Sequence, residues 1–245
     1  MTTKVIPGML IAVVSADDVA REASARIAKA IQECISERGR AVVALSGGET
    51  PKAAYGRLAA IQLDWSKVEV LFVDERAVPE SSDRSNYRMI KAAFLDPARI
   101  PPENVHRMPA DAPDLEQAAR EYAQVVTKVA TKGPTGPQID VMVLGVGDDG
   151  HTASLFPGDP ALSVMDRPVV AVAASGAREA RLSLSVPVVE AARSAFILAV
   201  GAKKTPALEK VWSVSGDTSA TPARILRNIR GHVMWVIDKA AGGMG

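Results

Sequence analysis

Catalysis by a histidine is the first chemistry that the sequence suggests. One of its three histidines, His151, lies in a glycine-rich stretch after an apolar run. A histidine near its usual pKa of about 6.5 can remove a proton from water at neutral pH, and the neighbouring Asp149 could orient the ring or hold the water. His106 follows an Ile-Pro-Pro-Glu turn and His232 begins an expected strand, so both are interpreted as structural or exposed. The sequence predicts His151 as a general base; a histidine that only satisfies hydrogen bonds within its loop is the alternative.

A formal G-x-G-x-x-G pattern also occurs here, at Gly145, Gly147 and Gly150. Directly after a strand, this pattern is typical of dinucleotide binding. Two aspartates within it would lie where the pyrophosphate must approach the backbone, and no acidic residue ends the next expected strand. We therefore interpret residues 145–158 as a loop that presents catalytic side chains.

A second glycine turn, Ser46-Gly47-Gly48-Glu49-Thr50-Pro51, follows an expected strand at residues 41–45. The two glycines let the backbone bend tightly and turn its N–H groups towards a ligand. Thr50 is a good N-cap and Pro51 suits the first helical position. A helix N-terminus aimed out of the sheet favours phosphate, although a plain strand-to-helix turn would read the same. The Gly-Lys-Ser/Thr ending of a nucleotide P-loop is missing.

Three charged residues, Asp74-Glu75-Arg76, follow the expected strand 68–73. Ligands of α/β folds bind at the carboxyl ends of strands, which favours a binding role here over a plain solvated loop. Arg76 could contact charge that develops on a carbonyl oxygen, or orient a phosphate. Ser85 or Asn86 is expected to cap the helix that follows.

Several function classes are disfavoured by what the sequence lacks. There is no G-x-S-x-G nucleophile turn and no zinc-ligand spacing, so acid–base chemistry on a small phosphorylated molecule, without metal or cofactor, is expected. A formal charge of +1 argues against a broad basic face for nucleic acid. The apolar segment 9–14 is too short to span a membrane, and the single Cys34, expected in a helix core, favours a reducing compartment. We expect a soluble, cytoplasmic protein with neither nucleic acid nor membrane as partner.

Short apolar runs alternate with longer amphipathic ones along the chain. This alternation predicts an α/β fold, with a mainly parallel twisted sheet and helices on both faces, in one domain over residues 1–245. The expected strands are 9–14, 41–45, 68–73, 139–144, 169–173, 181–185, 195–200 and 232–237. The expected helices are 17–38, 51–60, 86–95, 114–131, 188–193 and 204–214, with a break at 132–137.

Together the motifs resemble the 6-phosphogluconolactonase family, a sister of the glucosamine-6-phosphate isomerase/deaminases. The matching segments follow the family's order along nearly the whole chain. They are Leu45-Ser-Gly-Gly48 with Thr50-Pro51, Asp74-Glu75-Arg76, Ser85-Asn86-Tyr87, Asp149-Gly-His-Thr-Ala-Ser-Leu-Phe-Pro-Gly158, Arg181-Leu-Ser-Leu-Ser185, Gly201-Ala-Lys-Lys204, Ile225-Leu-Arg227, Val233-Met-Trp235 and Asp238.

The resemblance implies a Rossmann-like fold of the sugar-phosphate isomerase/deaminase type. It also implies hydrolysis of 6-phospho-D-glucono-1,5-lactone to 6-phosphogluconate, the second step of the oxidative pentose phosphate pathway. His151 would be the general base and Arg76 would act near the lactone. The substrate- and phosphate-binding positions would be Ser46, Gly47, Gly48, Thr50, Asp74, Arg181 and Lys204. Glu49 departs from a position that is often small and polar in the family, and either Lys203 or Lys204 could reach the phosphate.

Two other functions stay open at this point. The sister activity, isomerisation and deamination of an aminosugar phosphate, would need residues after the histidine loop that are not apparent. A catalytically silent sugar-phosphate sensor would need an output module, and no helix-turn-helix or basic extension accompanies the domain. The phosphorylated sugar lactone is the expected small-molecule partner, and a monomer or weak homodimer is expected.

Overall fold

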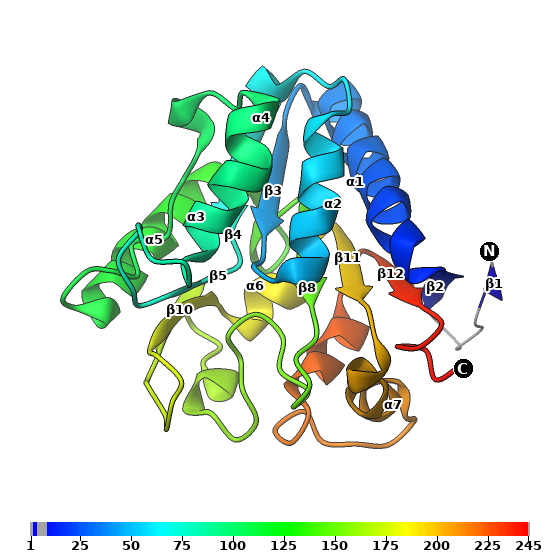
Figure 1. Ribbon diagram of the computed structural model, residues 1–245. Coiled ribbons are helices and arrows are strands. Elements are labelled where there is room, and N and C mark those ends of the chain that lie inside the picture. Colours follow the sequence, from blue (N-terminus) through cyan, green and yellow to red (C-terminus); the bar gives the residue numbers. More distant parts are fainter. Residues whose placement is uncertain (1, 4–8, 245) are drawn as a thin grey trace.

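The computed structural model describes residues 2–3 and 9–244, and its centre is a seven-stranded sheet in the order β1-β2-β12-β11-β8-β3-β4 (Figure 1). Neighbouring strands are parallel, except that β1 is antiparallel to β2. The strands are β1 (Thr2–Thr3), β2 (Leu10–Val14), β3 (Ala41–Leu45), β4 (Val68–Phe72), β8 (Val141–Gly145), β11 (Ser194–Ala199) and β12 (His232–Asp238). The predicted α/β class with a mainly parallel sheet is confirmed.

Helices cover both faces of this sheet. Helices α1 (Ala16–Arg38) and α2 (Glu49–Ala59) lie in front of it in Figure 1, whereas α6 (Val186–Glu190) and the 3-10 helix η6 (Pro222–Asn228) lie behind it. The stripe of α1 that faces the core includes Val19, Ala23 and Ile27, spaced as one helix face. The helix ends at Gly39, whose φ of 78° is the left-handed conformation that glycine adopts without steric cost.

The remaining helical segments are short, apart from α5 and α7. They are η1 (Trp65–Lys67), α3 (Asn86–Ile90), η2 (Lys91–Leu95), α4 (Asp96–Ala98), η3 (Pro102–Asn104), α5 (Leu115–Val129), η4 (Pro160–Ser163), η5 (Ala202–Lys204) and α7 (Thr205–Trp212). The helix expected at 86–95 thus runs on to Ala98, with a π-helical turn at η2. Pro97 lacks the N–H that would continue an α-helical ladder, and the wider turn directly precedes it. No helix in the described part of the chain is long and apolar enough to cross a membrane.

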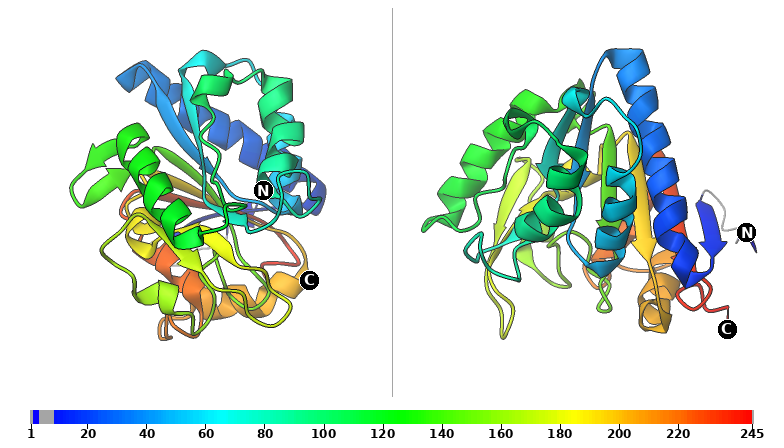
Figure 2. Two further views of the ribbon diagram at one scale, coloured as in Figure 1. Left: turned by 90° about the vertical axis from the view of Figure 1, so that its left-hand side faces the viewer. Right: turned by 45° about the horizontal axis from the view of Figure 1, so that its top comes forward.

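A second, three-stranded sheet was not anticipated from the sequence. It joins β5 (Asp74–Arg76), β10 (Arg181–Leu184) and β9 (Val169–Val172), all antiparallel (Figure 2). The connection from β9 to β10 is short and is closed by a bridge between Ser175 and Arg178. A parallel pair would need a crossover of about a dozen residues or more, so this short connection dictates an antiparallel hairpin. A second hairpin, β6 (Thr131–Gly133) with β7 (Gly136–Gln138), occupies the break expected at 132–137.

The order of the main sheet decides where the loops meet. Strands β11, β8 and β3 are neighbours and parallel, so their carboxyl ends lie side by side at the lower edge of the sheet in Figure 1. Strand β3 leads into Ser46 and α2, β8 leads into the loop 146–158, and β11 leads into η5. Leu184 of β10 donates from its backbone N–H to the carbonyl of Val73, which places the small sheet beside this edge. Ligand sites of α/β folds form at such an edge.

Candidate active site

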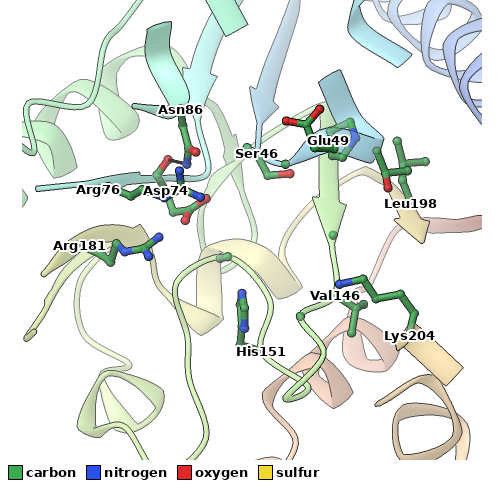
Figure 3. A pocket seen from close by; sticks show the side chains of 17 residues that line it. Ser46, Glu49, Asp74, Arg76, Asn86, Val146, His151, Arg181, Leu198 and Lys204 are labelled. Atoms are coloured by element: carbon green, nitrogen blue, oxygen red, sulfur yellow. Dashed lines mark hydrogen bonds between the residues drawn. The ribbon is translucent and has the colours of Figure 1, made fainter. Parts of the chain in front are cut away.

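A pocket opens at this edge, and nine of the ten sequence-predicted site residues line it; the tenth, Asp149, contacts the lining residue His151. The pocket is lined by Ser46, Gly47, Gly48, Glu49, Thr50, Pro51, Asp74, Arg76, Asn86, Gly145, Val146, Gly147, His151, Ala153, Arg181, Leu198 and Lys204. Figure 3 shows Arg76, Asp74 and Arg181 on one side of His151 and Lys204 on the other. Within residues 2–3 and 9–244, no group of three or more His, Cys, Asp or Glu side chains could hold a metal ion.

The His151 ring is held by the carboxylate of Asp149. The Nδ1 atom lies 2.6 Å from Asp149 Oδ1, and the same oxygen accepts the backbone N–H of His151 at 3.0 Å. The side-chain hydrogen bond from His151 lowers the pKa of Asp149 to about 2, so this carboxylate is ionised at neutral pH. An ionised acceptor at Nδ1 keeps the ring proton there and leaves Nε2 as the basic nitrogen. Gly147 permits this arrangement, because a Cβ at that position would lie 2.1 Å from His151 Nδ1.

Phe156 and Arg178 support the same ring, and the sequence analysis assigned no role to either. The ring centroids of His151 and Phe156 are 4.5 Å apart, and Phe156 is buried. The guanidinium of Arg178 lies 3.8 Å from the Phe156 centroid and pairs with Asp159 at 3.1 Å. Phe156 is therefore fixed between the imidazole and a cation. Its place in the family motif was a signal, but the stacking depends on the β9–β10 hairpin, which the sequence did not reveal.

The N-terminus of α2 faces the pocket, but the predicted cap is wrong. The N-cap is Gly48, with a φ of 111°, and the helix begins at Glu49, so Thr50 and Pro51 lie inside the first turn. The first N–H groups of a helix have no partner within it, and here they border the pocket. Glycine adopts this positive φ without steric strain, whereas a threonine in the same conformation would be strained. Ser46 Oγ is buried at the same place and has no hydrogen-bond partner among residues 2–3 and 9–244.

Gly47 and Glu49 explain how this loop fits its surroundings. A Cβ on Gly47 would lie 2.0 Å from Asn86 Oδ1, so only glycine allows the loop to pass this close to the start of α3. Asn86 is itself fixed, since its Nδ2 donates to the carbonyl of Asp74 at 3.0 Å. Glu49 lines the pocket as well, but its side chain is 89% exposed and its carboxylate pairs with Lys52 at 3.4 Å.

Arg76 and Arg181 enter the pocket from neighbouring strands of the small sheet. Burial lowers the pKa of Arg181, and the nearby Asp74 carboxylate opposes that shift. Asp74 is buried and accepts a 2.6 Å hydrogen bond from Ser154 Oγ. Arg76 Nη1 donates to the carbonyl of Arg84 at 2.6 Å. The two cations are thus held at the pocket by groups that are themselves fixed.

Glu75 was not among the predicted site residues, and the structure gives it a structural place. Its buried carboxylate accepts hydrogen bonds from the backbone N–H groups of Arg76, Asn86 and Tyr87, and from Ser85 Oγ. Burial raises its pKa, and these hydrogen bonds oppose the rise. Ser85 is the N-cap of α3, as expected, and accepts from the N–H of Arg88. Glu75 therefore joins β5 to α3 and fixes the loop that carries Arg76.

Lys204, and not Lys203, lines the pocket. Lys203 is exposed, whereas the Lys204 ammonium lies 2.6 Å from Asp148 Oδ1 on the histidine loop. The turn before Lys204 is set by Gly201, whose φ is 94° and whose N–H donates to the buried Asp238 at 3.0 Å. Of the two lysines, Lys204 is the one at the pocket, and its contact with the phosphate stays a prediction.

Comparison with known proteins identifies the family. The family model for glucosamine-6-phosphate isomerases/6-phosphogluconolactonase matches residues 14–235. The chain belongs to this family. A 6-phosphogluconolactonase of Synechocystis is 41% identical over 86% of this chain and 88% of that protein. A 6-phosphogluconolactonase of Streptomyces coelicolor is 36% identical, over 91% and 89%.

Solved structures of the family share the fold. The 6-phosphogluconolactonase of Trypanosoma brucei has a TM-score of 0.86 at 26% identity and covers 99% of both chains. The Thermotoga maritima 6-phosphogluconolactonase has a TM-score of 0.81 at 27% identity, over 94% of this chain and 99% of that one. The expected resemblance to this family is confirmed.

Proposed function

We propose that this protein hydrolyses 6-phospho-D-glucono-1,5-lactone to 6-phospho-D-gluconate, the second step of the oxidative pentose phosphate pathway. The observation that carries the proposal is the His151–Asp149 pair, which leaves a basic Nε2 at a pocket bordered by three cations and a helix N-terminus. The relatives at 36–41% identity, which bear the name of this lactonase, support it.

In the proposed mechanism, His151 activates a water molecule. Nε2 takes one proton while the water oxygen bonds to the lactone carbonyl carbon, and the carbonyl electron pair moves onto the oxygen. Arg76 stabilises this oxyanion, as a preorganised donor does in a water-poor site. When the carbonyl re-forms, the bond to the ring oxygen breaks and the imidazolium returns its proton to that oxygen. The product acid then loses its proton to solvent.

The phosphate supplies the binding energy that places the lactone. We propose that it meets the N–H groups of the Gly47-Gly48 turn and Thr50, with Ser46 Oγ as a further donor. Arg181 and Lys204 approach it from opposite sides of His151. The Asp74 carboxylate attracts Arg181 and can accept a sugar hydroxyl. Ion pairs to phosphate are strong because both partners are charged.

The activity is tested by supplying the lactone, made in place from glucose 6-phosphate, and measuring 6-phosphogluconate formation above the spontaneous rate. Release of ammonia from glucosamine 6-phosphate is measured beside it, since the family model also covers isomerases. Acceleration with the lactone and no ammonia supports the proposal. Ammonia release without lactone hydrolysis would reassign the pocket to the aminosugar phosphate, and binding without turnover of either would indicate a sensor.

The cellular compartment, the oligomeric state and the partners of the enzyme are also proposed. We propose that it acts as one domain over residues 1–245, in the cytoplasm, as a monomer or weak homodimer, without nucleic acid, membrane, metal or cofactor. A buried, free Cys34 suits a reducing compartment. Sedimentation of the purified protein at several concentrations would measure the oligomeric state.

A further inference from the structure

The Lys204 ammonium has a carboxylate of the same chain beside it. Asp148 Oδ1 lies 2.6 Å from Lys204 Nζ, across the gap between the histidine loop and η5. Asp148 is the one ion-pair partner that residues 2–3 and 9–244 give to Lys204. The Asp148 side chain is 59% exposed and the Lys204 side chain 26% exposed. The carboxylate can therefore swing into solvent, while the ammonium stays at the pocket wall.

A phosphate bound to Lys204 would be repelled by this carboxylate. A phosphate monoester carries a charge between −1.5 and −2 at neutral pH, and a second anion within a few ångströms repels it. The neighbouring Asp149 is different, because its carboxylate is engaged by His151. The turn 147–151 thus directs one carboxylate to the base and one to the phosphate-binding lysine.

We propose that Asp148 is an internal competitor for Lys204, displaced when a phosphate enters, and that it thereby sets the affinity of the pocket for phosphorylated ligands. The inference rests on the proposed function, since it assigns Lys204 to the phosphate. The competition weakens substrate and product alike, so it favours product release. It acts on ligands that carry a phosphate and leaves a neutral sugar lactone unaffected.

The expected size of the effect follows from the exposure of the pair. An exposed ion pair contributes little free energy, which corresponds to a change of about two- to fivefold in a binding constant. Removing the Asp148 charge should therefore tighten phosphate binding by about two- to fivefold. High salt should reduce the difference, because a partly exposed pair is screened.

The test is calorimetric titration of the wild-type protein and Asp148→Asn with 6-phosphogluconate and with inorganic phosphate. The matched control is Glu49→Gln, which removes another carboxylate at the pocket but one that pairs with Lys52. The inference predicts tighter binding of both ligands by Asp148→Asn and a smaller change in Glu49→Gln. In a Lys204→Met background, Asp148→Asn should have no effect on affinity.

Weaker binding by Asp148→Asn would overturn the inference, since Asp148 would then position Lys204 for the phosphate. Equal binding would overturn it too, since the carboxylate would then not compete for Lys204. A gain that persists without Lys204, or that Glu49→Gln matches, would also overturn it and leave only a general charge effect. Lactone turnover by the wild type separates the two proposals. If turnover is present while Asp148→Asn gains no affinity, this inference alone fails; if turnover and phosphate binding are both absent, both fail.

Discussion

Arg76 and Arg181 lie directly opposite each other on the neighbouring antiparallel strands β5 and β10. Like charges in such a pair destabilise a sheet. Asp74 and Glu179 offset part of the repulsion, since Glu179 Oε2 lies 3.4 Å from Arg181 Nη2 and the Asp74 carboxylate also attracts it. The remaining repulsion between these two cations at the pocket would be relieved by a bound anion.

Replacing Arg181 by methionine should separate stability from binding. The apolar stem is kept while a mostly buried cation is removed. Because the repulsion from Arg76 and the attraction of Asp74 and Glu179 are lost together, the free energy of unfolding should change by no more than about 1 kcal/mol. Binding of 6-phosphogluconate should weaken by at least about tenfold, because a charge-assisted contact is lost. Thermal unfolding and calorimetric titration measure the two effects. A less stable variant with unchanged affinity would show that Arg181 only supports the sheet.

The pKa of Asp149 gives a pH-dependent prediction. Its pKa is lowered from an ordinary value of 3.8 to about 2 by the hydrogen bond from His151, so its contribution to stability is present above pH 4 and is lost as the pH falls towards 2. The difference in unfolding free energy between wild type and Asp149→Asn should therefore be largest near pH 6 and shrink below pH 4. Urea unfolding at pH 6, 4 and 3 measures it. A difference that grows on acidification would contradict the pairing.

Gly47 should not tolerate a methyl group. The new methyl group of Gly47→Ala would collide with Asn86, whose amide donates a hydrogen bond to the Asp74 carbonyl. Because Asn86 is held in place, the phosphate loop must move. We expect the protein to lose about 1–3 kcal/mol of stability and to bind phosphate more weakly. Gly56→Ala is the matched control in the middle of α2, where a Cβ meets nothing within 4 Å. It should stabilise the protein by about 0.5–1 kcal/mol. Equal changes in stability in the two variants would contradict the close contact between Gly47 and Asn86.

Phe156 should matter to rate more than to affinity. In Phe156→Leu the imidazole loses its aromatic neighbour, and a small displacement of the base should lower kcat by about 10- to 100-fold with little change in product affinity. Phe94→Leu is the control, because Phe94 is fully buried against Trp65, away from the pocket. It should lower stability and leave kcat nearly unchanged. If both variants lost only stability, the support of His151 by Phe156 would be disproved.

Some features were predictable from local patterns alone. Strand β3 reads as a continuous apolar run because it is buried on both faces, and the glycine turns after β3 and β8 mark where ligand loops begin. His151 stood out because its loop follows a strand end. These signals rest on adjacent residues, so the sequence carries them directly.

Other features depend on contacts between distant residues, which no local pattern reveals. Glu75 reads as one of three solvated charges, yet the N-terminus of α3 folds over it and makes it buried. Phe156 meets Arg178 only through the β9–β10 hairpin. The predicted start of α2 was wrong because Thr50 and Pro51 are the residue types that usually begin a helix. In the structure the N-cap is Gly48, whose φ of 111° suits glycine, and the helix begins at Glu49.

His151 is the residue on which the proposed hydrolysis depends most directly. The decisive measurement is the rate of 6-phosphogluconate formation above the spontaneous rate for wild type and His151→Ala, with 6-phosphogluconate binding measured on both. If His151 is the base, His151→Ala should lose about 10²–10⁴-fold in rate and retain product binding. A His151→Ala variant that hydrolyses the lactone at the wild-type rate would contradict this role.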